Sequence, residues 1–158
     1  MMIFIFYLSN SMKRFAIKEF EEILEIDVQD HMGVRYELMA TYCNLEDYDK
    51  AKNFFECEQM EYHEEDLMIV PMMTVSLMTG HIEDADFYFD FLYAKNPEFE
   101  NYLKMIEQGD DERLVAETLK VNPILFEANS MKSLLMVFNQ VVDLSQSEYF
   151  FTWLIEKY

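Results

Sequence analysis

Glycine, proline and cysteine are scarce in this 158-residue sequence, and each shortage excludes a class of protein. Three glycines and three prolines are too few for a many-turned β-sandwich or barrel, and they argue against glycine-rich loops. Two cysteines, Cys43 and Cys57, do not make a disulfide framework. Because no secretory signal pattern is found either, we expect a protein of the reducing cytoplasm.

Basic residues are also few. Lys and Arg number 12 against 31 Asp and Glu, which gives a formal net charge of −19 at pH 7. A chain this acidic is repelled by phosphate backbones and anionic lipid surfaces, so we expect no direct binding to nucleic acid or membranes. Residues 19–66 hold 16 of the acids and only three bases. This segment is either a solvated face or a docking surface for a basic protein or peptide.

Long hydrophobic runs are missing as well. The apolar start, Met1–Leu8, has eight residues, whereas a membrane span needs about 20. We expect this start to dock on the fold as an extra hydrophobic turn; a contact between copies and a true start at Met12 are the alternatives. Hydrophobic residues nevertheless make up 51% of the chain and aromatics 16%, which excludes intrinsic disorder.

Apolar residues recur at helical spacing along nearly the whole chain. We therefore predict one all-α domain over residues 1–158, with about seven to nine helices. The segment 65–78 is apolar nearly all round and should be buried, although Pro71 must either start or kink it. The expected helices cover 10–26, 32–43, 48–59, 65–78, 83–95, 98–107, 111–119, a stretch carrying Met131 to Val142, and a last helix from Ser145. The expected caps are Asp47, Asn96, Asn122 and Ser145 at helix starts and Gly80 at a helix end.

An internal repeat is visible between residues 46 and 89. Ala51 and Ala85 occupy the same place in two similar segments, and each is followed four residues later by a phenylalanine, Phe55 or Phe89. A small residue in a second helix lets the first helix pack closely against it. We therefore expect the two alanine segments to be equivalent second helices of neighbouring helix hairpins.

This pattern resembles the tetratricopeptide repeat, a helix–turn–helix unit of about 34 residues, which is the interval from Ala51 to Ala85. The matching residues are Leu38 and Tyr42 in the first copy and Gly80, Ala85, Phe89 and Pro97 in the second. The departures are Arg35 and Ile69 at the usual tryptophan, Met39 and Met73 at a small residue, His63 at the closing proline, and Leu119 where a third alanine would fall. The likeness covers residues 32–97, with helical flanks over 1–31 and 98–158. It implies an antiparallel helix-pair array, an α-solenoid, whose first helices line a concave face that binds a protein or peptide.

The resemblance also indicates which side chains meet the partner. The first-helix residues that we expect to be exposed for binding are Arg35, Tyr36, Met39, Met72 and Ser76. Arg35 is a base in an acidic neighbourhood, and it either neutralises nearby carboxylates or anchors a carboxylate of the partner.

Motifs for catalysis or metal binding are not found. The sequence has no nucleophile elbow, phosphate loop or dinucleotide fingerprint, and its histidines, His31, His63 and His81, lack metal-ligand spacing. We expect no enzyme activity, no cofactor and no metal, and we expect both cysteines to pack in the core.

The function predicted from the sequence is therefore non-catalytic binding of a protein or peptide, as a scaffold or adaptor. Two alternatives stay open. One is an acidic inhibitor that mimics nucleic-acid charge and occupies a basic nucleic-acid-binding protein. The other is a structural homo-oligomer that associates through its apolar ends, Met1–Leu8 and Phe150–Tyr158.

Overall fold

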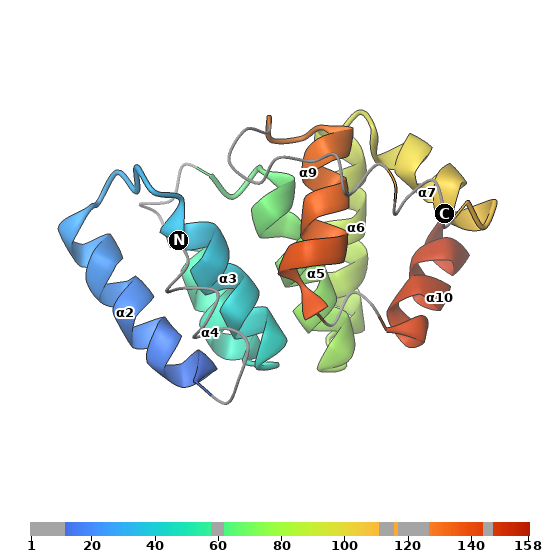
Figure 1. Ribbon diagram of the computed structural model, residues 1–158. Coiled ribbons are helices and arrows are strands. Elements are labelled where there is room, and N and C mark those ends of the chain that lie inside the picture. The colour runs from blue at the N-terminus through green and yellow to red at the C-terminus, as the bar shows by residue number, and fades with distance from the viewer. Residues whose placement is uncertain (1–11, 58–61, 111–115, 117–126, 144–146) are drawn as a thin grey trace.

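The protein is all-α in the residues that the computed structural model describes, which are 12–57, 62–110, 116, 127–143 and 147–158. These ranges contain eight α-helices and one π-helical turn, which confirms the predicted class and number (Figure 1). The elements are α2 (Lys13–Ile26), α3 (Val34–Asn44), α4 (Tyr48–Phe55), α5 (Asp66–Met78), α6 (Ile82–Lys95), α7 (Phe99–Glu107), α9 (Met131–Met136), η1 (Val137–Val141) and α10 (Glu148–Lys157). The predicted segment Met1–Leu8, the predicted cap Asn122 and all of 111–119 except residue 116 lie outside the described residues.

Two helix hairpins, α3–α4 and α5–α6, follow one another at the interval that separates Ala51 from Ala85. The first helices end at Asn44 and Met78, and the second helices begin at Tyr48 and Ile82, so both pairs keep this interval. Ala51 in α4 and Ala85 in α6 have no exposed surface, and the phenylalanines that follow them are buried too. The two alanine segments are thus equivalent second helices of successive hairpins, as the spacing predicts.

The turns of the two hairpins have the same hydrogen-bond pattern. Each first helix ends in a Schellman motif, in which the residue after the cap adopts a left-handed conformation. That residue is Glu46 in the first turn, with φ 55°, and the predicted Gly80 in the second, with φ 83°. The bonds run from the N–H groups of Glu46, Asp47, Gly80 and His81 to the carbonyls of Cys43, Tyr42, Leu77 and Ser76, respectively, at 2.8–3.1 Å.

This equivalence gives a paired prediction. A residue with a Cβ at positive φ is strained by roughly 1–2 kcal/mol, partly offset by the greater chain entropy that glycine loses on folding. Glu46→Gly should therefore raise the free energy of unfolding by about 0.5–1 kcal/mol. Gly80→Ala should lower it by about 1 kcal/mol, through backbone strain alone, because no atom lies within 4 Å of the added Cβ. Urea denaturation of the two variants checks this; shifts of the same sign would contradict it.

Helix α5 is the centre of the molecule. It packs against α3, α4, α6, α9, η1 and α10, and each of its residues from Asp66 to Leu77 is buried, as predicted. The helix begins at Asp66 and continues through Pro71. Figure 1 shows α9 in front of α5, and the short helix also contacts α7. The C-terminal segment α9–η1 therefore covers α5, the first helix of the second hairpin, and α9 also packs on α7.

The predicted helix caps are confirmed only in part. Asp47 caps α4, because its carboxylate accepts a hydrogen bond from the N–H of Lys50. Asn96 accepts a hydrogen bond from the N–H of Glu98 at 2.8 Å, but α7 begins at Phe99, with Glu98 at its N-cap position and no side-chain cap there. Helix α10 is capped by Ser147 and not by Ser145, which lies outside the described residues.

The apolar C-terminal end is only partly exposed. Phe150 and Leu154 of α10 have no exposed surface, whereas Tyr149 and Tyr158 are 57% and 40% exposed. Helix α10 packs on α7 and α5 through its buried side. The exposed large hydrophobic residues of this end are therefore the two tyrosines.

Candidate functional site

The residues predicted to meet a partner are mostly inaccessible. Met39, Met72 and Ser76 have no exposed surface, Arg35 is 5% exposed, and only Tyr36 is half-buried. The expectation that they are exposed is therefore wrong for four of the five. The physical reason is that α3 and α5 pack directly on each other while α9 and η1 cover α5.

Arg35 neutralises a carboxylate within its own chain. Its Nε donates to Asp30 Oδ2 at 2.6 Å, and its Nη2 donates to the carbonyl of Gln29 at 3.0 Å. The guanidinium lies 3.5 Å from the centroid of the Tyr62 ring, a cation–π contact. Of the two interpretations of Arg35, the neutralising one is confirmed by this geometry.

Tyr36 joins the two hairpins. Its hydroxyl, on α3, donates a hydrogen bond to the carboxylate of Glu65, the residue that precedes α5. Burial and this carboxylate raise the pKa of Tyr36 well above its usual value. The phenol is therefore a neutral donor at physiological pH, and it links the start of α3 to the start of α5.

An accessible groove lies elsewhere, between α2 and α4, with α3 as its floor. Its volume is about 890 Å³. One wall is helix α2 and the turn that follows it, and the opposite wall is the end of α4. The lining residues are Glu21, Leu24, Glu25, Val28, Gln29, His31, Arg35, Leu38, Tyr42, Phe54, Cys57 and Tyr62. We call this the α2–α4 groove.

The groove runs along the helices. On α2 the lining positions are 21, 24 and 25, and on α3 they are 35, 38 and 42, which in both cases is one face of a helix; Val28 lies in the turn after α2. Seven residues of α-helix rise about 10 Å, so the groove extends for about two helical turns. Its floor is apolar, since Leu38 and Tyr42 are buried and Phe54 lies edge-on to Tyr42 at 5.9 Å.

Two exposed carboxylates give this groove its charge. Glu21 and Glu25 are both exposed on α2, and Glu21 accepts a hydrogen bond of 2.6 Å from the Tyr42 hydroxyl. Burial raises the pKa of Tyr42, with Glu21 as a further cause, so this hydroxyl stays protonated. The Arg35 guanidinium that lines the groove pairs with Asp30, and the ring of His31 lies 2.8 Å from the carboxylate of Asp27. The groove is therefore an apolar channel with an acidic wall.

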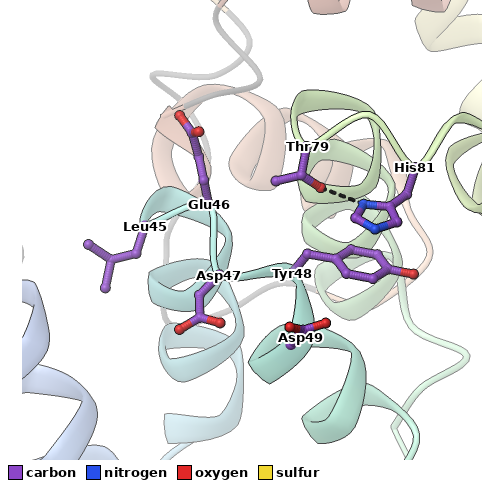
Figure 2. Close-up of a pocket in the computed structure, with 7 residues that line it drawn as sticks. All are labelled: Leu45, Glu46, Asp47, Tyr48, Asp49, Thr79 and His81. Atoms are coloured by element: carbon purple, nitrogen blue, oxygen red, sulfur yellow. Dashed lines mark hydrogen bonds between the residues drawn. The ribbon is translucent and has the colours of Figure 1, made fainter.

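A shallower pocket of about 410 Å³ lies where the two hairpin turns meet (Figure 2). Its centre is a stack of Tyr48 on His81, with ring centroids 3.6 Å apart, and His81 is also hydrogen-bonded to Thr79 at 2.9 Å. The Tyr48 hydroxyl donates to Asp84, whose pKa is lowered mainly by its hydrogen bond with Lys52 at 2.8 Å. Because these side chains stack on and hydrogen-bond to one another, we interpret the pocket as a packing contact between the two hairpins.

Comparisons of the chain with protein-family models, with curated proteins and with solved structures give no match. Its function is therefore inferred from the chain's own residues. Within the described ranges, no three His, Cys, Asp or Glu side chains are placed to hold a metal ion together. No helix of the described part has the length and apolar character needed to cross a membrane.

The two cysteines differ from one another. Cys43 is fully buried, and burial raises the pKa of its thiol, as expected for a core residue. Cys57 is exposed at the edge of the α2–α4 groove, which corrects the prediction that both cysteines pack in the core. The sequence pattern had no signal for this groove, because its walls come from helices whose mutual angle the pattern does not specify.

Proposed function

We propose that the protein is a non-catalytic, cytoplasmic protein-binding module of the divergent tetratricopeptide type, and that the α2–α4 groove receives its partner. The repeated hairpins, with matching turns and with buried alanines at the repeat interval, support the architectural part of this proposal. The covering of α5 by α9–η1 argues for a site outside the concave face that the resemblance implies.

The observation that carries the proposal is the groove itself. Ligand-binding clefts combine a mainly apolar lining with a few placed polar groups, and their volumes are typically about 300–1,000 Å³. The α2–α4 groove has both properties, with Leu24, Val28 and Phe54 as apolar lining and Glu21 and Glu25 as polar groups. Val28 is 74% exposed there, and it is an apolar group that a partner would cover.

The native cysteines provide the test. Because Cys43 is buried and Cys57 is exposed in the groove lining, alkylation of the intact chain by a small thiol reagent reports on Cys57. The probes are synthetic peptides of about 15 residues, near the shortest length at which isolated helices form in water. They include basic, neutral and acidic amphipathic helices and extended sequences. We expect at least one class to slow the alkylation severalfold.

The control compares two exposed apolar residues. Val28→Ser, in the groove, should weaken binding of the protecting peptide by about 1.5 kcal/mol, because the substitution removes two methyl carbons that the peptide would bury. Ile26→Ser, two residues away, 86% exposed and not part of the lining, should leave binding unchanged. Alkylation at an unaltered rate with every peptide class would refute the groove as a binding site.

The charge-mimic alternative is favoured by the net charge of −19. An acidic inhibitor of a nucleic-acid-binding protein acts through its field, so its binding falls steeply with salt and does not depend on one apolar side chain. Binding that is abolished at high salt and insensitive to Val28→Ser would therefore favour that alternative over the groove.

A further inference from the structure

We infer that the occupant of the α2–α4 groove is a short amphipathic helix of another protein, with lysine or arginine flanking its apolar stripe. This inference rests on the proposed function and specifies its partner.

The shape of the groove favours a helix over an extended peptide. Extended peptides gain affinity by hydrogen-bonding to an exposed strand edge, and their backbone groups need such partners when buried. Most of the groove lining lies on α2, α3 and α4, whose backbone groups bond within their own helices, and the rest lies in the turn after α2 and after the end of α4, with no strand edge among the described residues. A helix satisfies its own backbone, and two turns of it match the groove length of about 10 Å.

The apolar floor requires an apolar stripe on that helix. Leu38 and Tyr42 form the buried base, while Leu24, Val28 and Phe54 line the sides. A helix laid in a groove presents anchors at positions i, i+3 or i+4, and i+7, the same spacing as positions 35, 38 and 42 of α3 on the floor. The groove therefore has room to cover two or three apolar side chains of the partner helix.

The acidic wall requires basic residues beside the stripe. Glu21 and Glu25 lie one helical turn apart and are exposed along the groove, and the Arg35 guanidinium in the lining pairs with Asp30. A partner that carries Lys or Arg one turn apart meets both carboxylates. An acidic helix would bring like charges together in a partly desolvated site, where repulsion costs most.

The experiment measures dissociation constants by the protection of Cys57 in the intact chain. Three peptides of equal length are compared: a basic amphipathic helix, a scrambled peptide of the same composition whose apolar stripe is broken, and a twin in which each Lys is replaced by Glu. We expect the basic helix to bind at least about tenfold more tightly than either of the others at about 50 mM salt.

The role of the two carboxylates is tested with two double variants that each remove two negative charges, one pair inside the groove and one pair outside it. The double variant Glu21→Gln with Glu25→Gln should weaken the basic helix about tenfold. The matched control is Glu148→Gln with Glu156→Gln, on the exposed side of α10, which removes two charges away from the groove and should change binding less than about twofold. Circular dichroism spectra confirm that each variant is folded, which is expected because all four side chains are exposed.

The outcomes separate this inference from the proposed function. Equal binding of the scrambled or acidic peptide, or equal weakening by both double variants, overturns the basic-helix partner. If an extended or neutral peptide protects Cys57 instead, the groove remains a binding site with a different occupant. If no peptide protects Cys57, both the occupant and the groove are wrong.

Discussion

Replacing Asp66 by alanine is expected to lower the free energy of unfolding by about 3–5 kcal/mol. Asp66 opens α5 and has no exposed surface. Its carboxylate accepts four hydrogen bonds: from the N–H groups of Asn129 and Leu67 at 3.2 and 3.0 Å, from Asn96 Nδ2 at 2.9 Å, and from Ser133 Oγ at 2.5 Å. Without the carboxylate these donors lose a partner inside the protein.

The effect is large because the network connects three parts of the chain. Asn96 follows α6, Asn129 and Ser133 belong to the start of α9, and Asp66 starts the central helix. Urea denaturation measures the loss. Asp66→Asn, which keeps one acceptor oxygen, should lose less than Asp66→Ala, and Ser133→Ala about 1–2 kcal/mol, since this serine also completes the α9 capping box. An alanine variant as stable as the parent would contradict this account of the network.

The same carboxylate should make stability depend on pH. Burial raises the pKa of Asp66 above its ordinary value of 3.8, with the hydrogen bonds acting in the opposite direction. Between 3.8 and the raised value, the folded state holds a proton that the unfolded state has lost, so the contribution of this group to stability falls as the pH rises. The stability difference between the parent and Asp66→Asn should therefore shift in favour of the parent as the pH is lowered from about 7 to about 4. A difference that is constant with pH would contradict the shift.

The sequence was sufficient to predict the all-α class and the two helix hairpins because its pattern is local and repeated. Helix α5 is apolar on all sides, which requires neighbours all round it, and the paired alanines specify where the second helices approach. Helix ends were less well predicted. Asn96 and Ser147 show why: a short polar side chain caps whichever nearby N–H the chain path brings to it.

The candidate site was not predictable in the same way. The family pattern places binding residues on first helices, but it does not state that a C-terminal segment, α9–η1, will pack on α5 and α7. Met72 and Ser76 would be predicted as exposed from the repeat pattern alone, but they are buried in α5, which this segment covers. The α2–α4 groove depends on how far α2 lies from α4, and Glu21 and Glu25 were visible in the sequence only as two acids among 31.

Removing Asp30 is expected to be as costly as removing Asp66. Its carboxylate accepts hydrogen bonds from the N–H groups of Val34 and Arg35 at 2.6 and 3.0 Å, so it caps the first turn of α3. It also pairs with the Arg35 guanidinium, and both side chains are nearly inaccessible, at 1% and 6% exposure. Asp30→Ala should lower the free energy of unfolding by about 3–5 kcal/mol, because it leaves a buried cation unpaired and a helix start uncapped.

A double-mutant cycle separates these two roles. Arg35→Met alone should cost about 2–3 kcal/mol, less than Asp30→Ala, because Asp30 keeps its two backbone donors. The double variant should be more stable than the sum of the single losses predicts, by about 1–3 kcal/mol, since neither charge is then left alone. Strict additivity in urea denaturation would show that the ion pair contributes nothing beyond the cap. Arg35 also lines the α2–α4 groove. Coupling of this size would therefore mean that the positive charge of Arg35 is balanced by Asp30, which leaves Glu21 and Glu25 to set the charge of the groove.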